Sequence, residues 1–212
     1  MSTSCPSMAE AAKIRDVAKR HAYVFDNGLC SPDFFDVEKR MASEEFWLLR
    51  ERISLQDTVL EVGCFTGLNL LGLAKRGHSG LFGIDFVQGA IEWLDSESES
   101  RGLSVSTMCD NFPNNERLFP FPPIAGRVIC FDVLEHQNNV GMFIEAVEGR
   151  LALDGRALFL VPIGKEFYDC GHVAFFPDAE CLRNVLDYVF DVEEIFELKT
   201  CRKLFASCKR RT

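Results

Sequence analysis

The sequence predicts an α/β protein built on a doubly wound, mostly parallel sheet of seven strands. From residue 57 to 187, short apolar runs rich in β-branched residues alternate with helical patterns, which is the order of a parallel sheet with helices on both faces. Two further runs, 189–198 and 203–208, are placed to pair as a C-terminal antiparallel hairpin. The region before residue 57 has only helical patterns, so we divide the chain into an extension (1–56) and a main domain (57–212).

The extension is expected to be helical and rich in aromatic residues. Apolar residues recur at spacings of three and four from Met8 to Phe25, which predicts one amphipathic helix that ends near Gly28. A second helical region begins at Ser31 and carries several large apolar side chains up to Leu49. We expect residues 8–53 to form a lid at the carboxyl edge of the sheet. The alternatives are packing on the flank of the sheet or a homodimer interface.

The remaining elements follow from apolar runs and from their Gly and Pro boundaries. Strands are expected at 58–62, 81–85, 103–109, 127–131 and 156–161. Helices are expected at 68–76, 88–94, 140–151 and 177–186. The acidic, serine-rich segment 95–100 is predicted to be a turn, and 111–126, with four prolines, a loop.

Composition limits the classes of partner and the compartment. The net charge of −9 disfavours binding to nucleic-acid phosphates or to anionic lipid, and no apolar stretch is long enough to span a membrane. The nine cysteines include no C-x-x-C pair, so no zinc ribbon and no metal site is expected. Cysteines within apolar runs suit a reducing compartment, and we expect a cytoplasmic protein.

The strongest chemical signal is the segment from Glu61 to Asn69, Glu-Val-Gly-Cys-Phe-Thr-Gly-Leu-Asn, where the first strand turns into a helix. Gly63 and Gly67 allow backbone to approach a ligand closely. Phe65 occupies the position of the second glycine of a dinucleotide-binding loop, and the third glycine is absent. The ligand of this loop therefore need not carry phosphates.

Acidic residues close the following strands at the same edge of the sheet. Asp85 ends the second strand, 24 positions after Glu61, where a carboxylate can accept hydrogen bonds from both hydroxyls of a ribose. Asp110 closes the third strand, and the fourth runs into Asp132-Val-Leu-Glu-His136. Asp85 could also cap the next helix, and Asp110-Asn111 is also good turn chemistry.

Together these motifs resemble class I S-adenosylmethionine-dependent methyltransferases of the small-molecule type, which have a Rossmann-like fold. The resemblance covers roughly residues 40–187 and implies S-adenosylmethionine as cofactor. It implies that Gly63, Cys64 and Gly67 line the methionine end and that Glu61 holds the amino group. Further expected cofactor contacts are Asp85 to the ribose, Asp110 with Asn111 to the adenine edge, Phe86 and Phe112 against the adenine, and Phe131 at the end of the fourth strand.

The acceptor and the catalytic groups are less well defined by these motifs. Methyl transfer from a sulfonium is an in-line displacement that depends mainly on placing the nucleophile, with a base needed only for a tightly held proton. His136 and His172 are the candidate bases, although each could be purely structural. The aromatic residues and the absence of an Asn/Asp-Pro-Pro-aromatic run favour a small-molecule acceptor. A non-catalytic regulatory subunit and a nicotinamide-dependent oxidoreductase remain alternatives.

Overall fold

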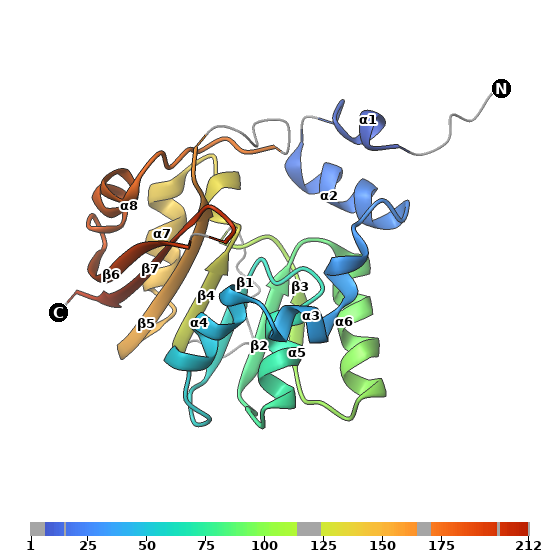
Figure 1. Ribbon diagram of the computed structural model, residues 1–212, viewed down its shortest axis with the longest axis horizontal. Coiled ribbons are helices and arrows are strands. Elements are labelled where there is room, and N and C mark those ends of the chain that lie inside the picture. Colours follow the sequence, from blue (N-terminus) through green and yellow to red (C-terminus); the bar gives the residue numbers. More distant parts are fainter. Residues whose placement is uncertain (1–6, 15, 114–123, 165–170, 199, 212) are drawn as a thin grey trace.

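The computed structural model contains a single seven-stranded sheet in the order β3-β2-β1-β4-β5-β7-β6 (Figure 1). It describes residues 7–14, 16–113, 124–164, 171–198 and 200–211. The strands are β1 (Val59–Val62), β2 (Leu81–Asp85), β3 (Ser106–Cys109), β4 (Ala125–Phe131), β5 (Leu151–Pro162), β6 (Phe190–Leu198) and β7 (Lys203–Arg210). The first five strands pair in parallel, and β7 pairs antiparallel with both β5 and β6. The predicted fold class and its C-terminal hairpin are thus confirmed.

Helices cover both faces of the sheet. They are α1 (Met8–Ala11), α2 (Val17–Asp26), α3 (Val37–Met41), α4 (Glu44–Arg52), α5 (Leu68–Lys75), α6 (Gln88–Ser100), α7 (Val140–Glu148) and α8 (Ala179–Leu186), with short 3-10 turns η1 (Pro32–Phe35) and η2 (Leu134–His136). One core cluster joins the sheet to α7 and α8, and a second joins it to α3, α4, α5 and α6. Strand β1 is central and fully buried, as expected for a parallel strand covered on both sides.

The extension contains several short helices where two longer helical segments were predicted. Helix α1 ends before Asp16, whose side chain caps α2 by accepting a hydrogen bond from the Lys19 N–H at 2.9 Å. Capping side chains also begin η1, α3 and α4, and these are Ser31, Asp36 and Ser43. Because each cap satisfies free N–H groups of a new helix, it starts a helix inside a pattern that periodicity alone reads as continuous.

The extension also serves two different structural purposes. Helix α4 buries Phe46, Leu48 and Leu49 in the core between the sheet and α5, so this part covers a face of the sheet. Helices α1 and α2 lie beyond one edge of the sheet instead (Figure 1). Only the part of the extension before α3 is therefore available to form a lid.

Several predicted boundaries were wrong for local reasons. Helix α6 continues through 95–100, so the segment predicted as a turn is helical. Within it, Ser98 is buried and its hydroxyl donates to the Asp95 carbonyl. Helix α7 stops at Glu148, and Leu151, predicted as its last residue, begins β5 and is fully buried. Strand β3 begins at residue 106 instead of 103, and β4 begins at 125, inside the predicted loop.

In the described part of the chain, every helix is too short or too polar to cross a bilayer.

Candidate cofactor and acceptor site

A pocket opens at the carboxyl ends of β1, β2 and β3, next to the segment that follows β4. Its described lining residues are Val62, Gly63, Ile84, Asp85, Phe86, Asp110, Asn111, Phe112, Val133 and Gln137. Six of the ten expected cofactor residues are in this set: Gly63, Asp85, Phe86, Asp110, Asn111 and Phe112. Parallel strands end at one edge of the sheet, and this is why residues far apart in sequence meet here.

The loop after β1 owes its shape to left-handed backbone conformations. Gly63 has φ +70° and Gly67 has φ +64°, both in the region that favours glycine. A Cβ on Gly63 would lie 2.4 Å from a methyl carbon of Val133. Phe65 has φ +49°, which is costly for a residue with a side chain. The loop thus brings backbone close to the pocket wall where larger residues would collide.

Asp85 fixes this loop through its carboxylate. One oxygen accepts a hydrogen bond from the Phe65 N–H at 2.9 Å, and the other accepts from the Val87 N–H at 2.8 Å. Burial raises the pKa of Asp85, and these backbone hydrogen bonds oppose that shift. Each carboxylate oxygen can accept a second hydrogen bond, so the structural role leaves capacity for a ligand hydroxyl. The alternative raised from the sequence, that Asp85 caps the next helix, is not what the structure shows: Val87 is the N-cap of α6 without a side-chain cap, and Asp85 holds the backbone just before it through the Val87 N–H.

Asp110 and Asn111 form a turn beside Asp85. The Asp110 N–H donates to the Asp85 carbonyl at 2.8 Å, and the Asn111 N–H donates to the Asp110 carboxylate at 2.7 Å. The turn chemistry expected from the sequence is therefore present. Phe112 follows, is buried, and packs its ring edge-to-face against Phe143 with centroids 5.6 Å apart.

Glu61 lies beneath the loop and is almost fully buried. One of its oxygens accepts a hydrogen bond from the Asn69 amide at 2.6 Å, while the other has no hydrogen-bond partner in the described part of the chain. Burial raises the pKa of Glu61 to about 7, against the opposing effects of the Asn69 hydrogen bond and the Arg40 charge. A buried acceptor without a partner is costly, and a ligand that donates a hydrogen bond there would remove the cost.

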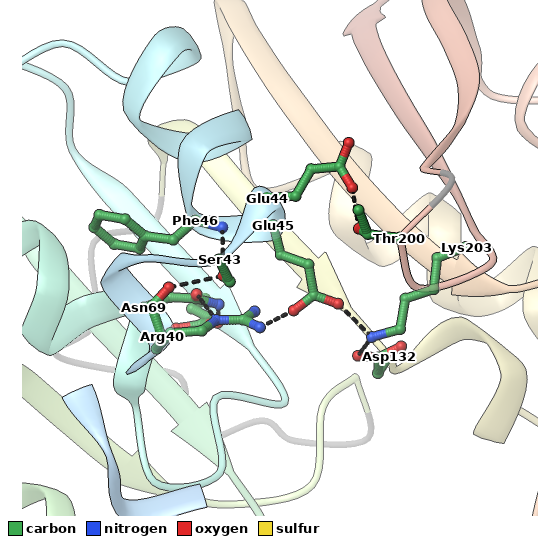
Figure 2. A network of polar contacts seen from close by, with 10 residues as sticks. Arg40, Ser43, Glu44, Glu45, Phe46, Asn69, Asp132, Thr200 and Lys203 are labelled. Atoms are coloured by element: carbon green, nitrogen blue, oxygen red, sulfur yellow. Dashed lines mark hydrogen bonds and ion pairs between the residues drawn. The ribbon is translucent and has the colours of Figure 1, made fainter. Parts of the chain in front are cut away.

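A network of charged groups connects Glu61 to the extension and to β7. The Arg40 guanidinium donates to the Asn69 side-chain carbonyl at 2.7 Å and also pairs with Glu45 (Figure 2). Lys203 then bridges Glu45 and Asp132, with nitrogen–oxygen distances of 2.6 Å to each (Figure 2). Sequence reasoning missed Arg40, Asn69 and Lys203 as site residues, because nothing local in the sequence links positions this far apart.

The remaining predicted residues lie outside the pocket. The Cys64 sulfur faces the β2 backbone at Gly83, and Gly67 begins α5 and lies against Leu94. Phe131 is buried on the other face of the sheet, where its ring contacts that of Phe205. The cofactor roles expected for Cys64, Gly67 and Phe131 stay predictions.

Phe65 points toward the extension. Its ring makes edge-to-face contacts with Phe25 and Phe34, at centroid distances of 5.6 and 5.4 Å. The Thr66 hydroxyl donates to the Phe34 carbonyl at 2.5 Å. Phe65, which occupies a glycine position of dinucleotide-binding loops, thus packs the loop against the helices above it.

Three histidines from distant segments gather beside the pocket. The rings of His136 and His172 meet edge-to-face at 4.7 Å, and His21 of α2 meets His136 at 5.2 Å and stacks on Phe86 at 5.8 Å. His136 Nδ1 lies 3.3 Å from the Gly171 carbonyl, to which it can donate. The structure therefore brings together both predicted catalytic histidines and adds His21, which sequence reasoning missed.

Burial shifts the pKa values of the three histidines and of the neighbouring Glu135. Burial lowers the pKa of His21 and of His172 to about 4, with His136 adding to both shifts, and burial also lowers the pKa of His136. Beside them, burial raises the pKa of Glu135 to about 8, with a further contribution from Asp132. These shifts favour the uncharged imidazoles at neutral pH.

A doubly wound sheet with a glycine-bearing loop after β1 and acids at the ends of the next strands defines a nucleoside-binding class of α/β protein. Comparison with known proteins makes this specific. Residues 59–155 match the family model described as a methyltransferase domain. Among curated proteins, the chain is 32% identical over 87 residues to mouse EEF1A lysine methyltransferase 2, covering 41% of this chain and 34% of that one. It is 29% identical over 102 residues to the ubiquinone biosynthesis O-methyltransferase of Rickettsia felis, covering 47% and 39%.

Solved structures agree on the fold. The PH0226 protein of Pyrococcus horikoshii superimposes with a TM-score of 0.69 at 14% identity, covering 88% of this chain and 99% of that one. The methyltransferase domain matched by residues 59–155 agrees with the resemblance that the motifs carry, and S-adenosylmethionine is the cofactor of the class I enzymes that the chain resembles. The matched segments span little more than a third of the length of the two curated relatives.

Proposed function

We propose that this protein transfers the methyl group of S-adenosylmethionine to a small-molecule acceptor. The observation that carries the proposal is the pocket at the carboxyl edge, which combines the close backbone at Gly63 with the carboxylate of Asp85. The match of residues 59–155 to a methyltransferase domain supports the same conclusion.

The polar groups of the site suit the parts of the cofactor. Asp85 would accept hydrogen bonds from the ribose hydroxyls with its remaining lone pairs. The unpartnered oxygen of Glu61 would accept from the amino group, directly or through water. Asp110 and Asn111 would meet the adenine edge, and Phe86 its face, because all three line the same pocket.

The transfer itself requires a nucleophile on the line of the C–S bond, behind the methyl group. Orientation supplies much of the rate enhancement, because the sulfonium has already activated the methyl group. His136 and His172 are proposed to lie on the acceptor side, where an uncharged imidazole can accept the proton that an O–H or N–H acceptor releases.

Two features support a small acceptor. The aromatic rings of Phe25, Phe34 and Phe65 form an apolar wall above the loop, and His21 of α2 stacks on the pocket residue Phe86. We further propose that residues 8–35 act as a lid that closes over bound cofactor and excludes water. A homodimer interface is the competing role for this segment, and it predicts a dimer in sedimentation measurements.

Protein lysine methylation is a second candidate for the acceptor. The net charge of −9 would attract a lysine-bearing substrate, and one matched relative is named as a lysine methyltransferase. Incubation of the protein and labelled S-adenosylmethionine with a metabolite extract and, separately, with a protein extract distinguishes the two. Label confined to protein bands would refute the small-molecule proposal.

A thermal-shift comparison tests the cofactor directly. S-Adenosylmethionine and S-adenosylhomocysteine should both raise the melting temperature, because a ligand that binds only the native state stabilises it. NAD and NADP should not. A shift with NAD alone would refute the proposal, and binding without any turnover in either extract would favour the non-catalytic alternative.

A further inference from the structure

Three of the four histidines of the chain come together at one place, beside a buried glutamate. Histidines 21, 136 and 172 belong to α2, to the turn after β4 and to the segment before α8. Ligand atoms of Glu135, His136 and His172 all lie within 4.8 Å of one another, and His21 adjoins His136. We propose that this cluster binds a divalent transition metal, with His136, His172 and Glu135 as ligands and His21 as the fourth.

The donor set fits a metal such as zinc or cobalt. Imidazole nitrogen and carboxylate oxygen are ligands that these ions accept, usually in a four-coordinate arrangement. Ligand atoms around one such ion lie about 3 to 3.5 Å apart. The ligand atoms of Glu135, His136 and His172 lie within 4.8 Å of one another and would have to move closer around an ion, and His21, which is not in that group, would have to approach from its position beside His136.

His136 is also held in the orientation that a metal ligand needs. Its Nδ1 lies 3.3 Å from the Gly171 carbonyl, so a proton on Nδ1 is satisfied there and the lone pair remains on Nε2. Backbone carbonyls commonly fix the tautomer of metal-binding histidines in this manner.

Glu135 provides an independent observation. Its side chain is only 2% exposed, and one carboxylate oxygen has no hydrogen-bond partner within the described residues. Glu135 holds the segment around His172 as well, because its carbonyl accepts hydrogen bonds from the Val173 and Ala174 N–H groups at 2.8 and 3.0 Å. A bound cation would satisfy the orphaned oxygen.

Two basic side chains lie near the cluster. The Arg20 guanidinium donates to the Ile14 carbonyl at 2.8 Å, and its positive charge also acts on His21 and His136, so the carboxylate of Glu135 has to offset its repulsion of a bound cation. Lys203 is bound between two carboxylates, Glu45 and Asp132. The inference does not depend on cofactor binding, so the metal site and the cofactor site can fail separately. A bound metal would occupy the lone pairs proposed above as proton acceptors, so His136 and His172 would act as bases only in the metal-free protein.

Cobalt titration of the chelator-treated full-length protein tests the site. The expected result is saturation at one cobalt per chain, with visible bands of an oxygen- and nitrogen-ligated ion. His172→Gln should weaken binding by at least about tenfold, and His21→Gln should weaken it as well. His78→Gln is the matched control, since it changes the one histidine outside the cluster, and it should leave the affinity unchanged.

Several outcomes would overturn the inference. These are no saturable binding, equal affinity in the wild type and in His172→Gln, or a near-ultraviolet thiolate band that assigns the ion to cysteine. Circular dichroism of each variant identifies one that fails to fold, and the other cluster variant then decides. The thermal shift with S-adenosylhomocysteine, measured on metal-free protein, tests the cofactor proposal independently.

Discussion

Replacing Glu61 by Gln should change how stability depends on pH, because the buried carboxyl of Glu61 is hard to ionise in the folded state. Its pKa rises from 4.5 to about 7 on folding, with burial as the largest cause. An acid with a raised folded pKa makes the folded state bind more protons between these two values. The wild type should therefore lose stability as the pH rises from about 4.5 to 7 and then level off.

The size of the effect follows from the shift. A difference of about 2.5 pKa units corresponds to about 3 kcal/mol at high pH, of which about 2.5 kcal/mol develops between pH 5 and 8. Glu61→Gln removes this term and keeps a carbonyl that can accept the hydrogen bond from Asn69. The variant should gain about 2.5 kcal/mol relative to the wild type over that range.

Urea unfolding at pH 5, 6, 7 and 8 measures the difference, with equal m-values as the check that both proteins unfold alike. All other titrating groups are shared and cancel in the comparison. A difference that stays constant within about 0.5 kcal/mol would refute the reasoning, because Glu61 would then have the same charge in both states. Saturating S-adenosylhomocysteine should reduce the difference, since its amino group would stabilise the ionised carboxylate.

Two further predictions concern the loop and the lid. Asp85→Asn should lower affinity for S-adenosylhomocysteine at least about tenfold in calorimetric titration, because it removes charge-assisted hydrogen bonds worth roughly 1.5–3 kcal/mol each. An unchanged dissociation constant would mean that Asp85 only supports the backbone at Phe65 and Val87. Deleting residues 1–30 should leave a folded protein that binds cofactor more weakly, since α4 and its core contacts remain. Equal binding, or aggregation of the truncated protein, would rule out the lid.

The sheet could be predicted from the sequence because each strand and its following helix are local patterns. The buried run at β1, the acid that ends β2 and the two adjacent runs of the β6–β7 hairpin can each be recognised from neighbouring residues alone. Helix boundaries were less predictable. The new helix that begins after Asp16 depends on a single side-chain cap, which periodicity does not reveal. Helix α6 continues through 95–100 although serines and acids are typical of turns.

The site was predictable only where strand ends converge. Gly63, Asp85 and Asp110 could be assigned to one pocket because parallel strands end at one edge. His21 and Arg40 reach the site through the packing of the extension, and neither carries a sequence signal that relates it to positions beyond residue 57. The absence of C-x-x-C spacing likewise says nothing about a metal site whose ligands come from three separate segments.

The loop after β1 also indicates which ligand charge the site favours. In a dinucleotide-binding loop, free N–H groups at the start of the helix bind the pyrophosphate. Here the Phe65 N–H already donates to the Asp85 carboxylate, and Glu61 places a second acid beneath the loop. The loop therefore presents carboxyl oxygens where a dinucleotide-binding loop presents free N–H groups, which disfavours a phosphate and favours hydrogen-bond donors such as an ammonium or a ribose hydroxyl. Phe65 supports this arrangement. Its ring packs against Phe25 and Phe34, and these contacts hold the backbone in the left-handed conformation in which the Phe65 N–H points at Asp85.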